Sequence, residues 1–470
     1  MGPIYDDACA IGEDMTVLKP GAAVVRSSDD LTGSFASALR LPLLGLSLFL
    51  AFLFLRPADL VPALAVFRPA LVVLALTTVV FLLQNQGIVF IQYSTGKLLL
   101  VFWGAMALST VVSYWPGGSF WITVDFLKEI VVFVLIINTA LSLHALGRLI
   151  KVMIFSNGIL AMFAVRDYLT GNVSASGRIQ GVVSGLFDDP NDLALSLITM
   201  VPLIYWIIQT RATRRGRLLF IVLMVVVVSG VVATQSRGGF IALLGVAFMI
   251  VKESRKKMVA IFLCAIIAVA VILVAPRGAF DRFSTITSYQ GEETAQIRMH
   301  MWAAGVQMFA DHPVLGVGTG MFSAAYGKDY RDPGFPYNTW WTAHNTVIQV
   351  SAEMGLLGLA LWIGLVISGF SSLRTARRRI SLSDLDDRVK APLSWMISAL
   401  QTSLAGFILG AMFLSRAYDW ILVIILAMII AFLRMTERLS LDRAEVRWSG
   451  APRSEPLPTG RGMPRSRRLS

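Results

Sequence analysis

The chain has 470 residues, of which 56% are hydrophobic and only 15% are charged. Soluble domains carry about a quarter charged residues, so this composition excludes an ordinary soluble protein and indicates that most of the surface faces hydrocarbon. The net charge of +12 does not indicate nucleic-acid binding. The basic residues cluster in short runs between apolar segments and in the C-terminal tail, which is how membrane topology is encoded.

Twelve apolar segments reach or approach the length of about 20 residues that a helix needs to cross the hydrocarbon core. In chain order they cover about 36–55, 67–84, 98–114, 122–140, 147–168, 190–209, 218–235, 238–251, 258–275, 345–370, 394–414 and 418–434. The sequence therefore predicts an all-α integral membrane protein with about twelve transmembrane helices between residues 36 and 434.

The lysines and arginines set the predicted orientation. Most of them fall in turns on the same side as the two ends of the chain, with runs in 211–217, 252–257 and 374–379. Because basic residues favour the cytoplasmic side, both termini are predicted to be cytoplasmic. The segment 1–35 is then cytoplasmic, and the basic tail 435–470 is expected to be disordered and held near anionic lipid headgroups.

Two long loops fall on the outer side, at about 169–189 and about 276–344. Loops of this length in a compact protein are usually functional. In the first loop, Asp189 before Pro190 is typical of the cap that opens a helix. Arg178 in the same loop has no such structural explanation and is a candidate for binding a substrate.

Arg237 lies in the string Gln235-Ser236-Arg237-Gly238-Gly239, which joins the seventh and eighth segments with almost no loop. The arginine is therefore predicted at the outer membrane boundary. There its side chain either extends to the lipid headgroups or reaches into the protein. The two glycines allow another group to approach the backbone closely.

The second outer loop contains a predicted amphipathic helix at 295–311, with Arg298 and Trp302 as neighbours one turn apart. Its apolar stripe consists of Ile297, Met301, Ala304 and Met308. The glycines around Gly318 follow this helix. They have no preceding strand and so do not indicate a dinucleotide-binding fold, but their amides could bind an anion in a tight turn.

His344 and Glu353 flank the start of the tenth segment. A histidine at a helix start is favoured in its neutral form, which a general base requires; the alternative is an interfacial anchor beside two tryptophans. Glu353 lies within an apolar span, where an ionisable residue is a functional candidate. We expect it to pair with an arginine of another span, and a structural ion pair is as compatible with this as a catalytic role. Gly355 and Gly358 are expected to allow close helix packing.

These motifs in this order resemble the O-antigen ligase and polymerase superfamily. The resemblance rests on Ser236 to Gly239, Arg298 with Trp302, His312 to Gly318, and His344-Asn345 to Glu353, Gly355 and Gly358. The stretch Gly185 to Asn191 is similar to a further part of the pattern. It carries Asp188-Asp189 in place of the commoner Asn-Pro-Asn form, which leaves the acceptor open.

The resemblance implies an inverting, metal-independent glycosyltransferase of the bacterial inner membrane with its active site on the periplasmic side. The donor would be an undecaprenyl-diphosphate-linked glycan, and no cofactor, metal or nucleic acid is expected. His344 would be the essential histidine, and Arg237 and Arg298 the arginines that contact the diphosphate. Arg178, Glu353 and Gly318 would line the substrate site.

The acceptor distinguishes two related functions. A ligase would transfer the glycan to lipid A-core, and a polymerase would transfer it to another lipid-linked repeat unit. A flippase or transporter of lipid-linked saccharide is an alternative of another class, but it would favour charges near the midplane of several spans. A non-catalytic assembly or sensor subunit is a third possibility.

Overall fold

The computed structural model describes the segments 40–57, 61–84, 87–172, 189–211, 213–254, 293–332 and 340–449, and the single residues 179, 257, 258, 261 and 265. The chain divides into two units, Met1–Arg40 and Leu41–Ser470, and the second forms the helix bundle. Four predicted features lie outside the described residues: the segment 1–35, most of the helix at 258–275, Arg178 and the end of the basic tail.

All regular structure in the described segments is helical. In chain order the elements are α2 (Arg40–Leu55), η1 (Pro62–Phe67), α4 (Pro69–Leu83), α5 (Ser94–Val111), α6 (Pro116–Thr139), α7 (Leu143–Leu169), α8 (Pro190–Thr210), α9 (Arg214–Ala233), α10 (Arg237–Glu253), α13 (Glu293–Asp311), α14 (Phe322–Ala325), η4 (Tyr326–Tyr330), α15 (Thr346–Leu382), α16 (Asp387–Ala411) and α17 (Trp420–Ser449). The predicted all-α class is confirmed for this part of the chain.

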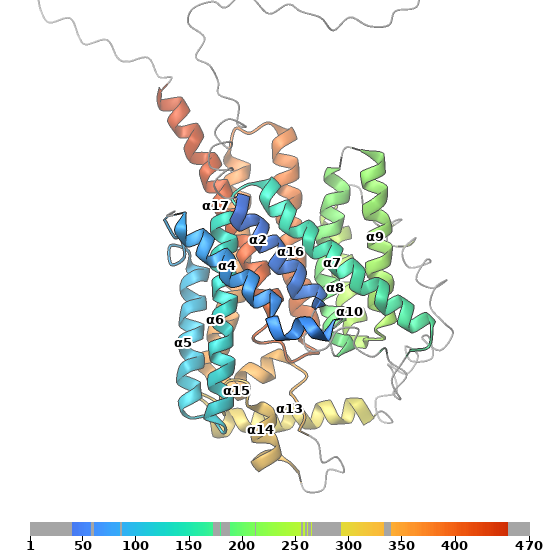
Figure 1. Ribbon diagram of the computed structural model, residues 1–470, viewed down its shortest axis with the longest axis vertical. Coiled ribbons are helices and arrows are strands. Elements are labelled where there is room, and N and C mark those ends of the chain that lie inside the picture. Colours follow the sequence, from blue (N-terminus) through green and yellow to red (C-terminus); the bar gives the residue numbers. More distant parts are fainter. Residues whose placement is uncertain are drawn as a thin grey trace, which may run out of the picture. The chain divides into compact units, whose positions relative to one another are not determined.

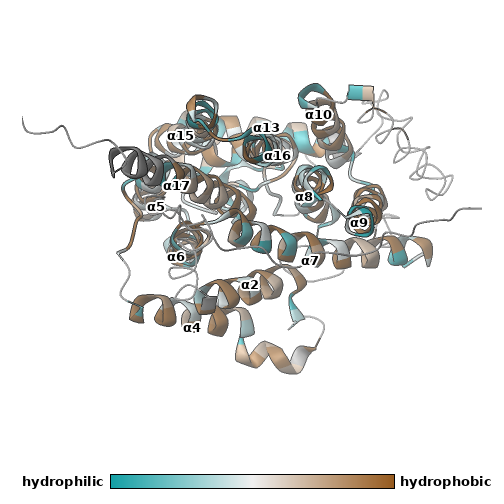
Figure 2. Ribbon diagram, turned by 90° about the horizontal axis from the view of Figure 1, so that it is seen from above, coloured by the Kyte–Doolittle hydropathy of each residue, from teal (hydrophilic) through white to brown (hydrophobic). Residues whose placement is uncertain are grey.

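Eight of the described helices are long and apolar enough to cross a membrane, and α2 is a shorter apolar helix. The helix α6 is not one of the eight, because it carries Asp125, Lys128 and Glu129 within its apolar stretch. The predicted count of twelve spans therefore stays a prediction. Figure 2 shows the helices as mostly apolar ribbons, and many large apolar side chains are exposed on them, as expected for surfaces that face lipid.

The helices α8 and α17 form the interior of the bundle. In α8 89% of the apolar stretch is buried, and in α17 83%, whereas the stretch Ala63–Leu83, which contains α4, buries only 17%. The helix α8 packs against α7, α9, α10 and α16, and α17 packs against α6, α15 and α16. Both are apolar on all sides, which is the pattern expected of a helix surrounded by protein.

One end of the bundle, which we call the site end, is where α8, α10 and α15 begin and where α5 and α16 stop. The 412–419 loop, which joins α16 to α17, lies at this end. In Figure 1, α13 lies at the lower end of the bundle, and it packs on α15. The helix ends that meet at the site end are those predicted to face outward, although the compartment itself stays a prediction.

The apolar stripe predicted for α13 is confirmed. Ile297, Met301, Ala304 and Met308 are all buried, at 7% exposure or less. They form a second apolar cluster with residues of the following segment and of α15, among them Val317, Phe322, Tyr326 and Ala352. The helix is therefore fixed to the bundle by the face that the sequence pattern identified.

The helix α15 is broken at Gly355, whose φ of 63° is left-handed. In a continuous helix the carbonyls of residues 352 and 353 would accept from the amides of 356 and 357. Instead they accept from Val317 (2.9 Å) and Gly318 (3.0 Å), while the 356 and 357 amides donate to Pro313 (2.7 Å) and Val314 (3.5 Å). The 313–318 segment thus replaces the missing helical hydrogen bonds, which a break in a spanning helix requires.

This break corrects the expectation that Gly355 merely allows two helices to pack closely. A Cβ atom at Gly355 would lie 2.4 Å from the carbonyl carbon of Val314. Glycine is needed at this position both for its left-handed backbone and for the close approach of the 313–318 segment.

Candidate functional site

His344 is held by its backbone at the site end. Its φ of 49° is left-handed, and its N–H donates to Ser415 Oγ of the 412–419 loop at 2.8 Å. The next residue, Asn345, caps α15 by accepting from the amides of Val347 (2.9 Å) and Ile348 (3.1 Å). The histidine therefore lies one residue before the cap, beside the positive end of the α15 dipole, with its imidazole ring half-buried.

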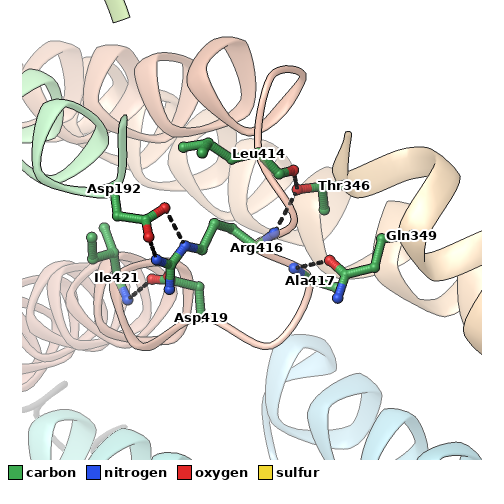
Figure 3. A network of polar contacts seen from close by, with 8 residues as sticks. All are labelled: Asp192, Thr346, Gln349, Leu414, Arg416, Ala417, Asp419 and Ile421. Carbon is green, nitrogen blue, oxygen red and sulfur yellow. Dashed lines mark hydrogen bonds and ion pairs between the residues drawn. The ribbon is translucent and has the colours of Figure 1, made fainter. Parts of the chain in front are cut away.

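Arg416 lies at the centre of a network of ion pairs and hydrogen bonds (Figure 3). Its Nε donates to Asp192 Oδ1 at 2.7 Å, its Nη2 pairs with the other Asp192 oxygen, and its Nη1 lies 3.5 Å from Asp419 Oδ2. Asp192 lies in the first turn of α8, where the helix dipole favours a carboxylate. Burial raises the pKa of the Asp419 carboxyl, and the Arg416 guanidinium opposes that rise.

The same loop is bonded to the first turn of α15 through its main chain. Thr346 Oγ1 donates to the Leu414 carbonyl at 2.7 Å and accepts from the Arg416 N–H at 3.0 Å. The Ala417 N–H donates to Gln349 Oε1 at 3.2 Å. Four consecutive residues of the loop, Leu414 to Ala417, are thereby held by side chains or backbone of the His344–Gln349 segment.

Arg237 begins α10, as predicted from the short connection before it. Ser236 caps this helix by accepting from the Gly239 N–H at 3.0 Å. A Cβ atom at Gly238 would lie 2.6 Å from Phe413 of the 412–419 loop, and one at Gly239 would lie 2.9 Å from Ala194 of α8. The glycines therefore bring the start of α10 against both the loop and α8, as their predicted role required.

Arg298 lies half-buried on α13, one turn before Trp302. The indole Nε1 of Trp302 donates to the carbonyl of Ala343 at 3.1 Å, directly before His344. Arg237, Arg298 and His344 are therefore linked by contacts of nearby residues. Gly238 packs on the 412–419 loop, Trp302 bonds to Ala343, and His344 itself bonds to that loop. Arg178, the third predicted arginine, lies outside the described residues.

Glu353 is 2% exposed and both of its carboxylate oxygens are bonded. Oε2 accepts from the Gly320 N–H at 3.0 Å, from Tyr418 OH at 2.9 Å and from Gln349 Nε2 at 3.3 Å. Oε1 accepts from the Phe322 N–H at 3.2 Å. Among the described residues no arginine pairs with Glu353, contrary to the expected ion pair, because amides and a phenol satisfy this carboxylate in place of a cation.

The glycine turn around Gly318 does bind an anion, but the anion belongs to the protein. The Gly320 amide donates to the Glu353 carboxylate, while the Gly318 amide donates to the Glu353 carbonyl. Gly318 has a φ of 112°, and a Cβ atom there would lie 2.1 Å from Ser113 Oγ. The turn is thus packed between α15 and the end of α5.

The cap predicted at Asp189 is confirmed, since its side chain accepts from the Asn191 N–H at 2.8 Å. The sequence patterns did not identify Asp192, Ser415, Arg416, Tyr418 or Asp419. The available signal was the string Ser415 to Asp419, which places several polar groups in a very short turn between two apolar segments.

In the described part of the chain no group of three or more histidine, cysteine or acidic side chains is arranged to hold a metal ion. The polar groups at the site end are guanidinium, imidazole, hydroxyl and amide groups together with carboxylates that already have partners. This arrangement suits an anionic ligand, since arginines bind phosphate groups bidentately.

Residues 222–363 match a family model described as O-antigen ligase. The resemblance to the O-antigen ligase and polymerase superfamily is confirmed. The matched region runs from within α9 into α15 and contains Arg237, Arg298, Gly318, His344 and Glu353, so these candidates lie inside the family domain. Arg416 and Asp192 lie outside it. No curated protein matches the chain.

Proposed function

We propose that the protein is a membrane glycosyltransferase that transfers a saccharide from undecaprenyl diphosphate to an acceptor hydroxyl at the periplasmic face of the bacterial inner membrane. The family match supports a glycosyltransferase of the O-antigen ligase type. The single observation that carries the proposal is the 412–419 loop, which bonds the backbone of His344 and packs on the first turn of the helix that begins with Arg237.

In the proposed reaction His344 accepts the proton of the acceptor hydroxyl. The hydroxyl oxygen attacks the anomeric carbon from the face opposite the diphosphate, and the bond between that carbon and the phosphate oxygen breaks. The products are the glycosylated acceptor with inverted configuration and undecaprenyl diphosphate. A neutral imidazole is required for this step, and the adjacent start of α15 favours that form.

Arg237, Arg298 and Arg178 are proposed to bind the diphosphate and to stabilise the charge that develops as it leaves. Guanidinium groups match phosphate oxygens in pairs and remain charged at every physiological pH. Because positive side chains fill this role, the proposed mechanism uses no metal ion and no cofactor.

Glu353 and Gly318 were predicted to bind substrate, and the structure supports a more indirect role. The Glu353 carboxylate is buried and joins α15 to the glycine turn and to Tyr418 of the 412–419 loop. We propose that Glu353 and Gly318 shape the site and that the three arginines and His344 contact the substrate.

The test is the variant His344→Asn, assayed with purified protein in lipid nanodiscs containing a lipid-linked glycan and an acceptor. Asparagine tolerates the left-handed backbone of residue 344 better than alanine, so the change removes the base with little strain. We expect transfer to fall by about a hundredfold or more. His300→Gln, on α13, is the matched control and retains activity. Full transfer by His344→Asn would refute the base assignment.

Glycan analysis of a deletion strain separates the two candidate acceptors. Loss of capped lipid A-core together with accumulated lipid-linked polymer identifies a ligase. Single repeat units on the core identify a polymerase, which the family match supports equally. Translocation of the lipid-linked saccharide without transfer would identify a flippase and contradict both.

A further inference from the structure

We propose that the Asp192–Arg416 ion pair positions His344 for proton transfer, by fixing the half of the 412–419 loop to which the His344 backbone is bonded. This inference rests on the proposed function and adds to it two residues outside the matched family domain. It makes Arg416 a positioning residue of the site rather than a ligand of the diphosphate.

The first step is the attachment of Arg416 to α8. The guanidinium is paired with both oxygens of Asp192 and lies close to Asp419 (Figure 3). The exposed fraction is only 20% for the Arg416 side chain and 12% for that of Asp192. A bidentate arginine–carboxylate pair fixes orientation as well as distance. Two carboxylates already neutralise this guanidinium, which argues against a further role in binding a diphosphate.

The second step is the path from Arg416 to His344. Arg416 is covalently adjacent to Ser415, whose hydroxyl accepts the His344 N–H at 2.8 Å. The Arg416 N–H, in the peptide bond with Ser415, donates to Thr346 Oγ1 at 3.0 Å. A displacement of Arg416 therefore moves the acceptor of the His344 N–H and the first turn of α15 together.

The third step is that the other half of the loop has its own anchor. Ala417 is bonded to Gln349, and Tyr418 is bonded to Glu353. Loss of the Asp192 pair therefore leaves Ala417 and Tyr418 held on α15 by two long side chains, while Leu414 to Arg416 keep only their bonds to Thr346 and His344 and lose the attachment to α8. The consequence is a local loss of geometry at His344 rather than collapse of the loop.

A second feature explains why His344 depends on this support. Its left-handed φ of 49° is uncommon for a residue other than glycine and persists only where surrounding contacts enforce it. The hydrogen bond to Ser415 Oγ is one such contact. Without it, the backbone of residue 344 is free to relax to a commoner conformation, which redirects the imidazole.

The experiment compares Asp192→Asn, Ser415→Ala and the double variant in the glycan-transfer assay, at saturating and limiting donor. We expect each single change to lower kcat roughly tenfold to a hundredfold, because misplacement of about 1 Å costs rates of that order. KM for the donor should stay within about twofold, because the arginines that bind the diphosphate are unchanged. Both changes interrupt one path, so the double variant should lose no more than the more impaired single variant.

Two controls separate positioning from general destabilisation. Ser415→Thr keeps the hydroxyl and should retain kcat. Glu437→Gln weakens an ion pair to Arg379 at the opposite end of the bundle and should also retain kcat. If Asp192→Asn fails to fold, as judged by gel filtration, Ser415→Ala alone carries the comparison.

Unchanged kcat in Ser415→Ala, a raised KM with normal kcat, or fully additive losses in the double variant would overturn the positioning proposal. These results would leave the proposed function intact as long as the wild type transfers glycan and His344→Asn does not. Absence of transfer by the wild type would overturn the proposed function first.

Discussion

The two ends of the helix bundle are joined in different ways. At the site end, the ion pair of Arg416 and Asp192 is largely buried, at 20% and 12% exposure, and the loops are bonded through their backbones. At the opposite end, Arg379 pairs with Glu437, and the exposed fractions of these two side chains are 36% and 30%. Tyr93 also donates to Glu437, and Arg434 donates to Asn138. Backbone is held at the opposite end as well, since Asn138 accepts from the Val89 N–H (3.1 Å) and donates to the Val89 carbonyl (2.8 Å). The difference between the two ends therefore lies in the burial of their ion pairs, which decides how much each pair contributes to stability.

The largest expected effect comes from removing one partner of each ion pair. Arg416→Ala leaves Asp192 and Asp419 buried without a cation and should lower the free energy of unfolding by about 3–5 kcal/mol. Arg379→Ala, at the opposite end, should cost about 0–1 kcal/mol, because its pair is partly solvated. Denaturant unfolding in detergent micelles measures the free energy of unfolding of both variants. Equal decreases in the two variants would contradict the difference between the two ends.

The break in α15 offers the next test. Gly355→Ala places a Cβ against the Val314 backbone at a left-handed φ and should cost about 2–3 kcal/mol. Gly364→Ala, in the second half of the same helix, meets nothing closer than 3.7 Å and should be neutral or stabilising by up to about 1 kcal/mol. Similar unfolding midpoints for the two variants would show that the glycine turn does not depend on the break.

Glu353→Gln tests the link between the glycine turn and the 412–419 loop. The amide group of glutamine must place its NH2 against at least one donor that the carboxylate now accepts from. The expected cost is about 1–3 kcal/mol, with reduced glycan transfer because either the glycine turn or Tyr418 loses a partner. Wild-type stability and activity in Glu353→Gln would show that the hydrogen bonds of Glu353 are not needed, and that only the Arg416 network fixes the geometry of the site end.

The smallest effect is expected at Glu129 of α6. The side chain is buried, its Oε2 has no hydrogen-bond partner among the described residues, and the Asp419 and Asp125 carboxyls lie close enough to act on it. Glu129→Gln removes the cost of burying an ionisable carboxyl beside other carboxyls and should raise the free energy of unfolding slightly, by less than about 1 kcal/mol. A clear loss of stability would mean that this carboxylate contributes to the network at the site end.

Much of the local structure follows from patterns that act over a few residues. The apolar segments predict the described helices because hydrocarbon requires their backbones to bond internally. The buried stripe of α13 follows from helical periodicity, and the Asp189 cap follows from the residue before a proline. Arg237, Arg298 and His344 were identified by their positions in a family pattern.

The features that were missed depend on contacts between distant parts of the chain. Gly355 lies in an apolar run with other small residues, so nothing nearby in sequence distinguishes a break from a packing position. Glu353 was expected to need a cation, because the amides of the glycine turn that satisfy it come from a segment more than thirty residues earlier. Arg416 could not be identified from nearby residues, because its partner Asp192 lies on α8, 224 residues earlier in the chain.

The exchange of hydrogen bonds at the α15 break also limits where this chain can change in length. The 313–318 segment matches its donors and acceptors to residues 352–357 one by one. Inserting a single residue between Pro313 and Gly318 would shift one half of that set by a position and leave buried amides and carbonyls unmatched. An insertion in the 313–318 segment should therefore lower stability more than an insertion of the same length in an exposed loop.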